Sequence, residues 1–135
     1  MSSRASVEAG TGASSDRGAS IRSVLESALG YNFADPELLI EALSHRSWCA
    51  EHGGPSNERL EFLGDAVLGL TVAEWTYQRY PEQPEGQLAK IRASVVSARA
   101  VADTARIVSL GDVLLLGRGE AKGGGREKDS ILSDA

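Results

Sequence analysis

Three carboxylates lie within the nonapeptide "ERLEFLGDA", residues 58–66, and their types and spacing could do chemistry. On a helix of about 100° per residue, Glu58, Glu61 and Asp65 fall within a sector of roughly 60°. Like charges three and four residues apart repel each other, and the repulsion grows as water is removed. A hard divalent cation would compensate this charge, because such ions bind carboxylate oxygens and keep several waters. Gly64 leaves room beside Asp65 for a ligand.

The alternative is that these acids pair with arginines from neighbouring helices, such as Arg46 or Arg92. Arg59 is the only basic residue within the nonapeptide, and on a helix it points about 100° away from Glu58. The spacing favours a bound cation, and both interpretations stay open on the residues alone.

The helix that carries the carboxylates is expected to be buried. Apolar side chains cover most of its remaining circumference: Leu60, Phe62, Leu63, Ala66, Val67, Leu68 and Leu70. A helix that is apolar nearly all round is typical of a protein interior, so its acidic stripe is no ordinary solvated face. Ser56 or Asn57 is predicted to cap this helix, which ends before Pro81.

The other segments also have helical patterns, so the predicted fold class is all-α. Ser20 is expected to cap a first helix, and Asp35-Pro36 opens a second one. Further helices are predicted through residues 88–95 and 100–107, and another begins at residue 130. Residues 1–19 are small and polar, and we expect a disordered extension there.

Residues 111–129 contain six glycines and four basic residues and are predicted to form a loop. The glycines and the basic side chains suit a flexible segment near a nucleic-acid backbone. A simple solvated loop explains the same composition equally well.

Length and composition limit the classes of protein that this chain can belong to. At 135 residues it is one domain at most. Its net charge of −5 argues against a nucleic-acid coat protein but not against a nucleic-acid enzyme with bound cations. A single cysteine, Cys49, excludes an intrachain disulfide and fits a reducing cytoplasm. No apolar run is long enough to predict a membrane span.

The segment "NERLEFLGDA" resembles the signature of the ribonuclease III family, endonucleases that cut double-stranded RNA. Similarity extends through "LGYNFADPELLIEALSHRS" at 29–47, "EGQLAKIRASVVS" at 85–97 and "LLLGRGEAKGGGREKDSILSDA" at 114–135. The resemblance implies the helical fold of the ribonuclease III endonuclease domain, with residues 20–135 forming that catalytic domain.

Position by position, the resemblance implies that Glu61 and Asp134 are Mg²⁺ ligands. It makes Asp65 the catalytic acidic residue, itself close to the metal, and Mn²⁺ is a possible substitute ion. Glu58 and Glu85 match further acidic positions that line the catalytic valley of the family.

The resemblance also implies a homodimer that hydrolyses double-stranded RNA to staggered products with 5′-phosphates. Expected roles are the processing of rRNA, mRNA and tRNA precursors in the cytoplasm. The family pattern continues past residue 135 with another glutamate, at what would be position 137, and with a double-stranded-RNA-binding domain. We therefore expect a C-terminally incomplete catalytic domain that lacks that second domain, and the activity of this chain stays open.

The alternative function is a non-catalytic RNA-binding or dimerisation module that kept the fold and lost the reaction. The presence of Glu61, Asp65 and Asp134 favours the enzyme, because degenerate members would be expected to lose acidic ligands. The glutamate missing from this chain keeps the alternative open.

Overall fold

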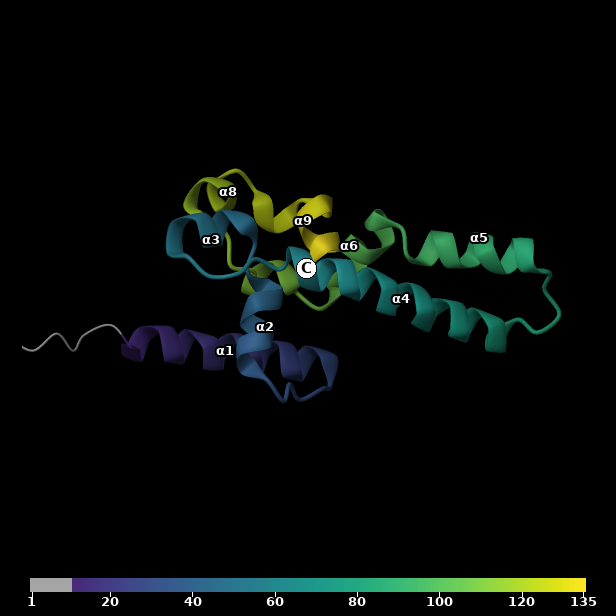
Figure 1. Ribbon diagram of the computed structural model, residues 1–135, viewed down its shortest axis with the longest axis horizontal. Coiled ribbons are helices and arrows are strands. Elements are labelled where there is room, and N and C mark those ends of the chain that lie inside the picture. The colour runs from purple at the N-terminus through teal and green to yellow at the C-terminus, as the bar shows by residue number, and fades with distance from the viewer. Residues whose placement is uncertain (1–10) are drawn as a thin grey trace, which may run out of the picture.

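Residues 11–135 are described by a computed structural model, in which about three quarters of these residues are helical (Figure 1). The elements in order are α1 (Thr11–Leu29), α2 (Pro36–Leu43), α3 (Arg46–His52), α4 (Glu58–Arg79), α5 (Glu85–Val95), α6 (Ala98–Ile107), α7 (Leu110–Val113), α8 (Arg118–Lys122), the 3-10 helix η1 (Gly125–Glu127) and α9 (Asp129–Asp134). The described residues form no β-strand, and the prediction of an all-α fold is confirmed. None of these helices is both long and apolar enough to cross a membrane.

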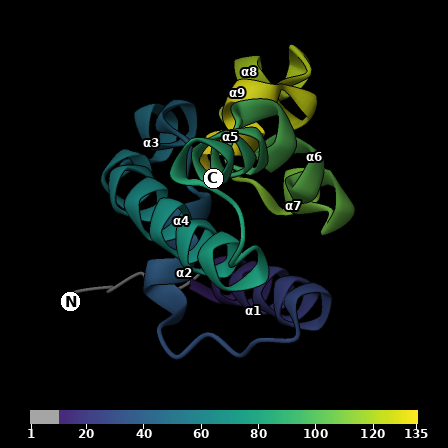
Figure 2. The ribbon, with the colours of Figure 1, turned by 90° about the vertical axis from the view of Figure 1, so that its right-hand side faces the viewer.

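The core lies where α1 and α2 meet the C-terminal helices. Its largest fully buried apolar side chains come from α1, α2, α9 and the segment that follows α7: Leu25, Leu43, Leu132 and Leu114. Residues 113–116 are buried throughout, and the backbone N–H of Leu115 donates to the carbonyl of Leu43 at 3.0 Å. Figure 2, viewed from the end where α4 and α5 connect, shows α8 at the top and α1 at the bottom of the molecule.

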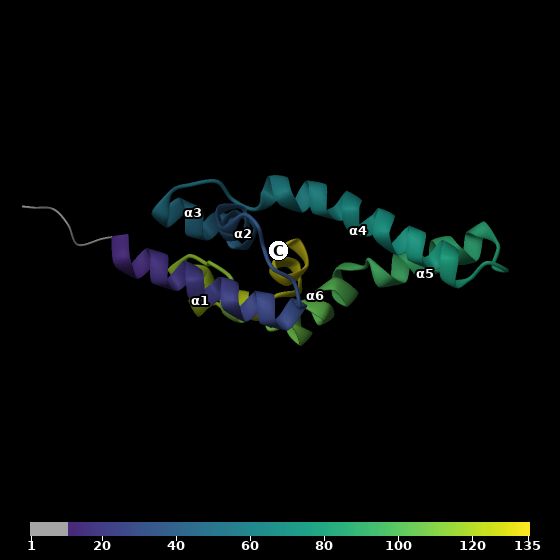
Figure 3. The same ribbon diagram turned by 90° about the horizontal axis from the view of Figure 1, so that it is seen from below.

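The long helix α4 leaves this body and pairs with α5 as a hairpin (Figure 3). The prediction that it is buried is wrong within the described residues, because only Val72 and Thr76 of α4 are buried. Phe62 is 83% exposed and Leu70 71% exposed. An apolar circumference predicts burial only when other residues cover it, and residues 11–135 cover little of this helix.

Helix α1 begins at Thr11, whereas the sequence predicts disorder up to residue 19 and a cap at Ser20. For residues 11–19 that prediction is wrong, and residues 1–10 lie outside the described part. This part of α1 makes a tertiary contact with α3. The guanidinium of Arg17 lies 5.9 Å from the ring centre of Trp48, where a cation–π attraction operates.

The segment 111–129 is not the predicted loop but contains α7, α8 and η1. Its backbone is held by the guanidinium of Arg126, which donates to the carbonyls of Gly111 at 2.7 Å and Leu114 at 2.8 Å. Lys128 pairs with Glu120. Two of the four basic side chains therefore hold this segment together, and they are not free for a nucleic-acid backbone.

Candidate active site

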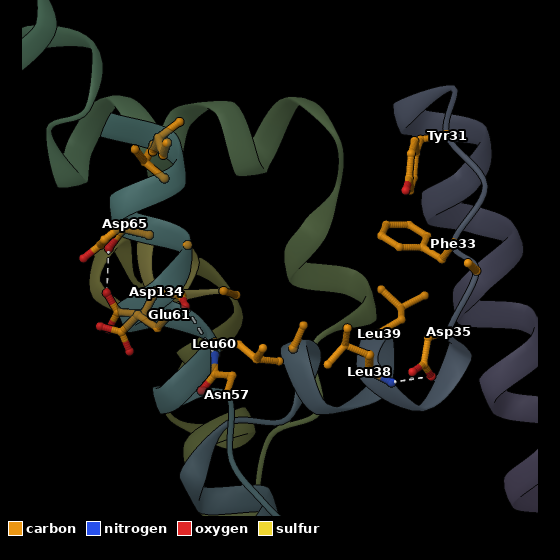
Figure 4. A pocket seen from close by; sticks show the side chains of 17 residues that line it. Tyr31, Phe33, Asp35, Leu38, Leu39, Asn57, Leu60, Glu61, Asp65 and Asp134 are labelled. Atoms are coloured by element: carbon orange, nitrogen blue, oxygen red, sulfur yellow. Dashed lines mark hydrogen bonds between the residues drawn. The ribbon is translucent and has the colours of Figure 1, made fainter. Parts of the chain in front are cut away.

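Three of the predicted site residues line one cavity of about 530 Å³ (Figure 4). Glu61 and Asp65 come from the first two turns of α4, and Asp134 comes from the end of α9. The rest of the lining is largely apolar and includes Tyr31, Phe33, Leu38, Leu39, Leu60, Leu68 and Val101. An open, mostly apolar cavity with a few convergent polar groups is the usual form of a ligand site.

The two helices reach this cavity for different reasons. In α4 a separation of four residues places Glu61 and Asp65 about one turn apart on one side of the helix. Helix α9 has only six residues, too few to be stable by itself, and tertiary packing must hold it. Ile131 and Leu132 provide that packing, since both are buried in the core, and they bring Asp134 to the cavity.

The carboxylate of Glu61 lies close enough to the other acids for their negative charges to affect its protonation. Burial raises the pKa of the Glu61 carboxyl, and the negative charges of Asp134, Asp65 and Glu58 raise it further. Among the described residues, none of these four carboxylates has a lysine or arginine nitrogen within ion-pairing distance. The alternative in which Arg46 or Arg92 neutralises the cluster is therefore not realised in this part of the chain.

Glu58 lies beside the same carboxylates but lines a different cavity. Its carboxylate accepts a hydrogen bond from the hydroxyl of Ser56 at 2.8 Å. Together with Glu61 and Asp134, it lines a second cavity of about 470 Å³. Glu61 and Asp134 thus separate two hollows, and Glu58 faces only the second of these.

Glu85 is not brought to either cavity. It is the first residue of α5, at the tip of the hairpin, whereas Glu61 lies near the opposite end of α4 (Figure 1). The helix rises about 27 Å between Glu61 and Arg79, at about 1.5 Å per residue. Within one chain, Glu85 is therefore too far from the other acids to share a ligand with them.

The donor set fits a hard divalent cation that keeps much of its water. Within residues 11–135, no group of three or more histidine, cysteine, aspartate or glutamate side chains is arranged to hold a metal ion, so these residues could supply at most two such ligands. Mg²⁺ usually takes only one or two protein carboxylates, and waters complete its octahedron. Glu61 and Asp134 supply two such carboxylates, and Mn²⁺ accepts the same oxygen ligands.

Asn57 is a site residue whose role the sequence does not reveal. It stands at the predicted cap of α4, but its side chain makes no capping hydrogen bond. Its amide instead donates to the backbone carbonyl of Asp134 at 3.4 Å. No local pattern could indicate this contact, because the two residues are 77 positions apart.

Comparisons with known proteins agree on one family. Residues 35–135 match the family described as ribonuclease-III-like. The chain is 54% identical over 120 residues to ribonuclease 3 of Streptomyces coelicolor, covering 88% of this chain and 43% of that protein. It is 59% identical over 119 residues to ribonuclease 3 of Mycolicibacterium paratuberculosis, covering 85% of this chain and 50% of that protein. The chain thus spans about half the length of these relatives.

Among solved structures, the nuclease domain of ribonuclease III from Campylobacter jejuni superposes with a TM-score of 0.77 at 46% sequence identity. The match covers 82% of this chain and 76% of that one. That structure is described as showing flexibility in a region involved in dimer formation.

Proposed function

Because the chain belongs to the ribonuclease-III-like family, we propose that it forms the nuclease domain of an endonuclease that hydrolyses double-stranded RNA. The observation that carries the proposal is the convergence of Glu61, Asp65 and Asp134 on one cavity. These acids have no basic partner among the described residues. Such an arrangement costs stability without a cation and attracts a divalent cation, which could in turn bind a phosphate that the carboxylates alone would repel.

The acidic side chains have different roles in the proposed reaction. Glu61 and Asp134 would hold Mg²⁺, or Mn²⁺ in its place, and the ion would neutralise charge on the phosphate and the leaving oxygen. Asp65, one turn along α4 from Glu61, would accept a hydrogen bond from the attacking water and orient it. Glu58 would add negative charge beside the ligands from the second cavity.

The proposed substrate is A-form RNA, which proteins read mainly by shape, phosphates and 2′-hydroxyls. Because the chain carries a net charge of −5, contacts to phosphates must come from local groups of basic residues. Arg46, Arg59, Arg118 and Lys122 are exposed and available for this role. We further propose that the substrates are rRNA, mRNA and tRNA precursors, processed in the cytoplasm.

A homodimer is the proposed assembly. The first turns of α4 expose Phe62 by 83%, Leu63 by 58% and Val67 by 56%, although such side chains are usually covered. The similar nuclease domain of Campylobacter jejuni has a region involved in dimer formation. A second copy that covers α4 would remove this apolar surface from water.

The competing function is a non-catalytic RNA-binding or dimerisation module. One observation favours it, namely that the described residues contain no closed group of three metal-ligating side chains. Such a module would bind RNA or a second copy without needing the carboxylates of Glu61 and Asp65.

Cleavage of double-stranded RNA by the full-length gene product separates the two functions. Asp65→Asn should abolish Mg²⁺-dependent cleavage while the circular-dichroism spectrum stays helical. Glu74→Gln is the matched control, because Glu74 is an exposed acid on the same helix and lines neither cavity. Equal cleavage by Asp65→Asn and the wild type would refute the catalytic role of Asp65. Retained RNA binding without any wild-type cleavage would refute the nuclease and favour the module.

A further inference from the structure

The side chain of Asn57 is buried at the start of α4, where only 6% of the residue is exposed. An asparagine at this position ordinarily accepts hydrogen bonds from the first backbone N–H groups of its helix. Here the residue has φ −70° and ψ −6°, and its side chain makes no such bond. A buried asparagine side chain that makes no capping hydrogen bond is expected to bond to another part of the protein.

Asn57 instead joins three separate segments of the chain. Its backbone N–H donates to the carbonyl of Ser44 at 2.9 Å, and its own carbonyl accepts from the N–H of Glu61 at 2.8 Å. Its side-chain amide donates to the carbonyl of Asp134 at 3.4 Å (Figure 4). One buried residue therefore contacts both of the residues whose carboxylates lie between the two cavities.

The end of α9 needs such a contact. Ile131 and Leu132 fix the middle of this short helix, whereas Asp134 lies beyond them and is exposed. Glu61 and Asp134 carry like charges, so their repulsion pushes the end of α9 away from α4. The Asn57 amide opposes this movement by donating to the backbone of α9, and it adds no charge of its own.

We propose that Asn57 is a positioning residue that holds the Asp134 end of α9 beside Glu61 and so sets the separation of these two carboxylates. The inference rests on the proposed function, in which both carboxylates hold a divalent cation. Asn57 would touch neither the cation nor the RNA, and its effect would pass through Asp134. Its loss should therefore weaken metal binding without removing a ligand.

Mn²⁺ titration of the 135-residue chain, followed by electron paramagnetic resonance, tests this inference without relying on cleavage. Asn57→Ala removes the donor and should weaken Mn²⁺ binding about tenfold or more, as is typical for residues that orient metal ligands. Asn57→Asp keeps the shape, replaces the donor with an acceptor and adds a negative charge. If Asn57 has no positioning role, the added charge of Asn57→Asp should attract Mn²⁺ and tighten its binding. If Asn57 positions Asp134, the same variant should bind Mn²⁺ more weakly.

Ser56→Ala is the control variant, because among the described residues the hydroxyl of Ser56 forms a hydrogen bond to the Glu58 carboxylate and none to Asp134. Asn57→Ser keeps a hydroxyl donor on a shorter side chain that does not reach the Asp134 carbonyl, so its Mn²⁺ affinity should resemble that of Asn57→Ala. In the full-length gene product, the Asn57→Ala variant should need more Mg²⁺ for half-maximal cleavage, with a smaller change in the rate at saturating Mg²⁺.

Unchanged or tighter Mn²⁺ binding by folded Asn57→Ala and Asn57→Asp would overturn the inference while leaving the proposed function intact. Loss of cooperative unfolding in all three Asn57 variants would also overturn it, because the residue would then hold the fold. A wild-type chain whose Mn²⁺ binding is absent, or is unaffected by Glu61→Gln, would instead refute the proposed metal site and this inference with it.

Discussion

Gly117→Ala should destabilise the protein through one close contact between α3 and the start of α8. A Cβ atom at Gly117 would lie 2.6 Å from the backbone oxygen of Ser47 and 2.8 Å from the carboxylate of Glu51. The backbone itself, with φ −61° and ψ 156°, suits any residue, so the cost is steric. The Ser47 oxygen belongs to the backbone and cannot move aside like the end of a side chain.

The magnitude follows from what must move. Overpacking of this kind costs about 1–3 kcal/mol. Retreat of α8 would also stretch two hydrogen bonds, from Gly117 N–H to Ser47 Oγ at 2.9 Å and from Arg118 N–H to Glu51 Oε1 at 2.8 Å. Each contributes about 1 kcal/mol, and the stiffer unfolded chain offsets roughly 0.4–1 kcal/mol. We expect a net loss of about 2–3 kcal/mol, which lowers the melting temperature by roughly 5–12 °C.

Urea unfolding and thermal melts of the 135-residue chain, with Gly119→Ala as the matched control, measure this effect. An added Cβ at Gly119 meets nothing within 4 Å, and Gly119 lies inside α8. That variant should therefore gain up to about 1 kcal/mol from its better helix propensity. Equal stability of Gly117→Ala and the wild type would refute the close packing of α3 on α8.

Three further predictions concern α9 and the carboxylates. Arg106→Met removes the partners of Asp129 and Asp103 and a hydrogen bond to the Glu127 carbonyl at 2.9 Å. Because these groups are partly exposed, the variant should lower the urea midpoint only modestly, and less at high salt, against an Arg99→Met control. No loss of stability at low salt would contradict the anchoring of α9. The raised pKa of Glu61 means that the folded chain binds more protons than the unfolded one just above the ordinary value of 4.5. Metal-free stability should thus fall as pH rises from 4.5 through the raised pKa, and melts of Glu61→Gln should show a smaller fall; identical pH profiles would contradict the crowding of the acids. Mg²⁺ at about 100 times its dissociation constant should add about 2.7 kcal/mol of stability to the wild type and far less to Glu61→Gln; melts that do not respond to Mg²⁺ would contradict a metal site.

The sequence was sufficient for the parts of the site that depend on local spacing. Glu61 and Asp65 are four residues apart on a helix, so a common face follows from helix geometry alone. The resemblance to a known family added Asp134, and the structure brings it to the same cavity. The contact from Asn57 to Asp134 could not be predicted, because it depends on how two distant segments pack.

Other features were mispredicted because local composition does not show which residues distant segments will pack against. The glycines of 111–129 indicated a flexible loop, yet a Cβ at Gly111 would lie 2.5 Å from the backbone oxygen of Arg126. Such glycines allow segments to approach closely, which composition cannot separate from flexibility. The apolar surface of α4 indicated burial, but burial requires a covering element that the described residues do not supply.

The central claim is that Glu61 and Asp134 together hold a divalent cation in the shared cavity. Crystals of the protein grown with Mn²⁺ and measured for anomalous scattering test this claim most directly. The account predicts one strong anomalous peak between the two carboxylates, about 2.1–2.2 Å from an oxygen of each, with waters as the remaining ligands and Asp65 close by. A map with no peak between Glu61 and Asp134, or with an arginine side chain at that position, would contradict it.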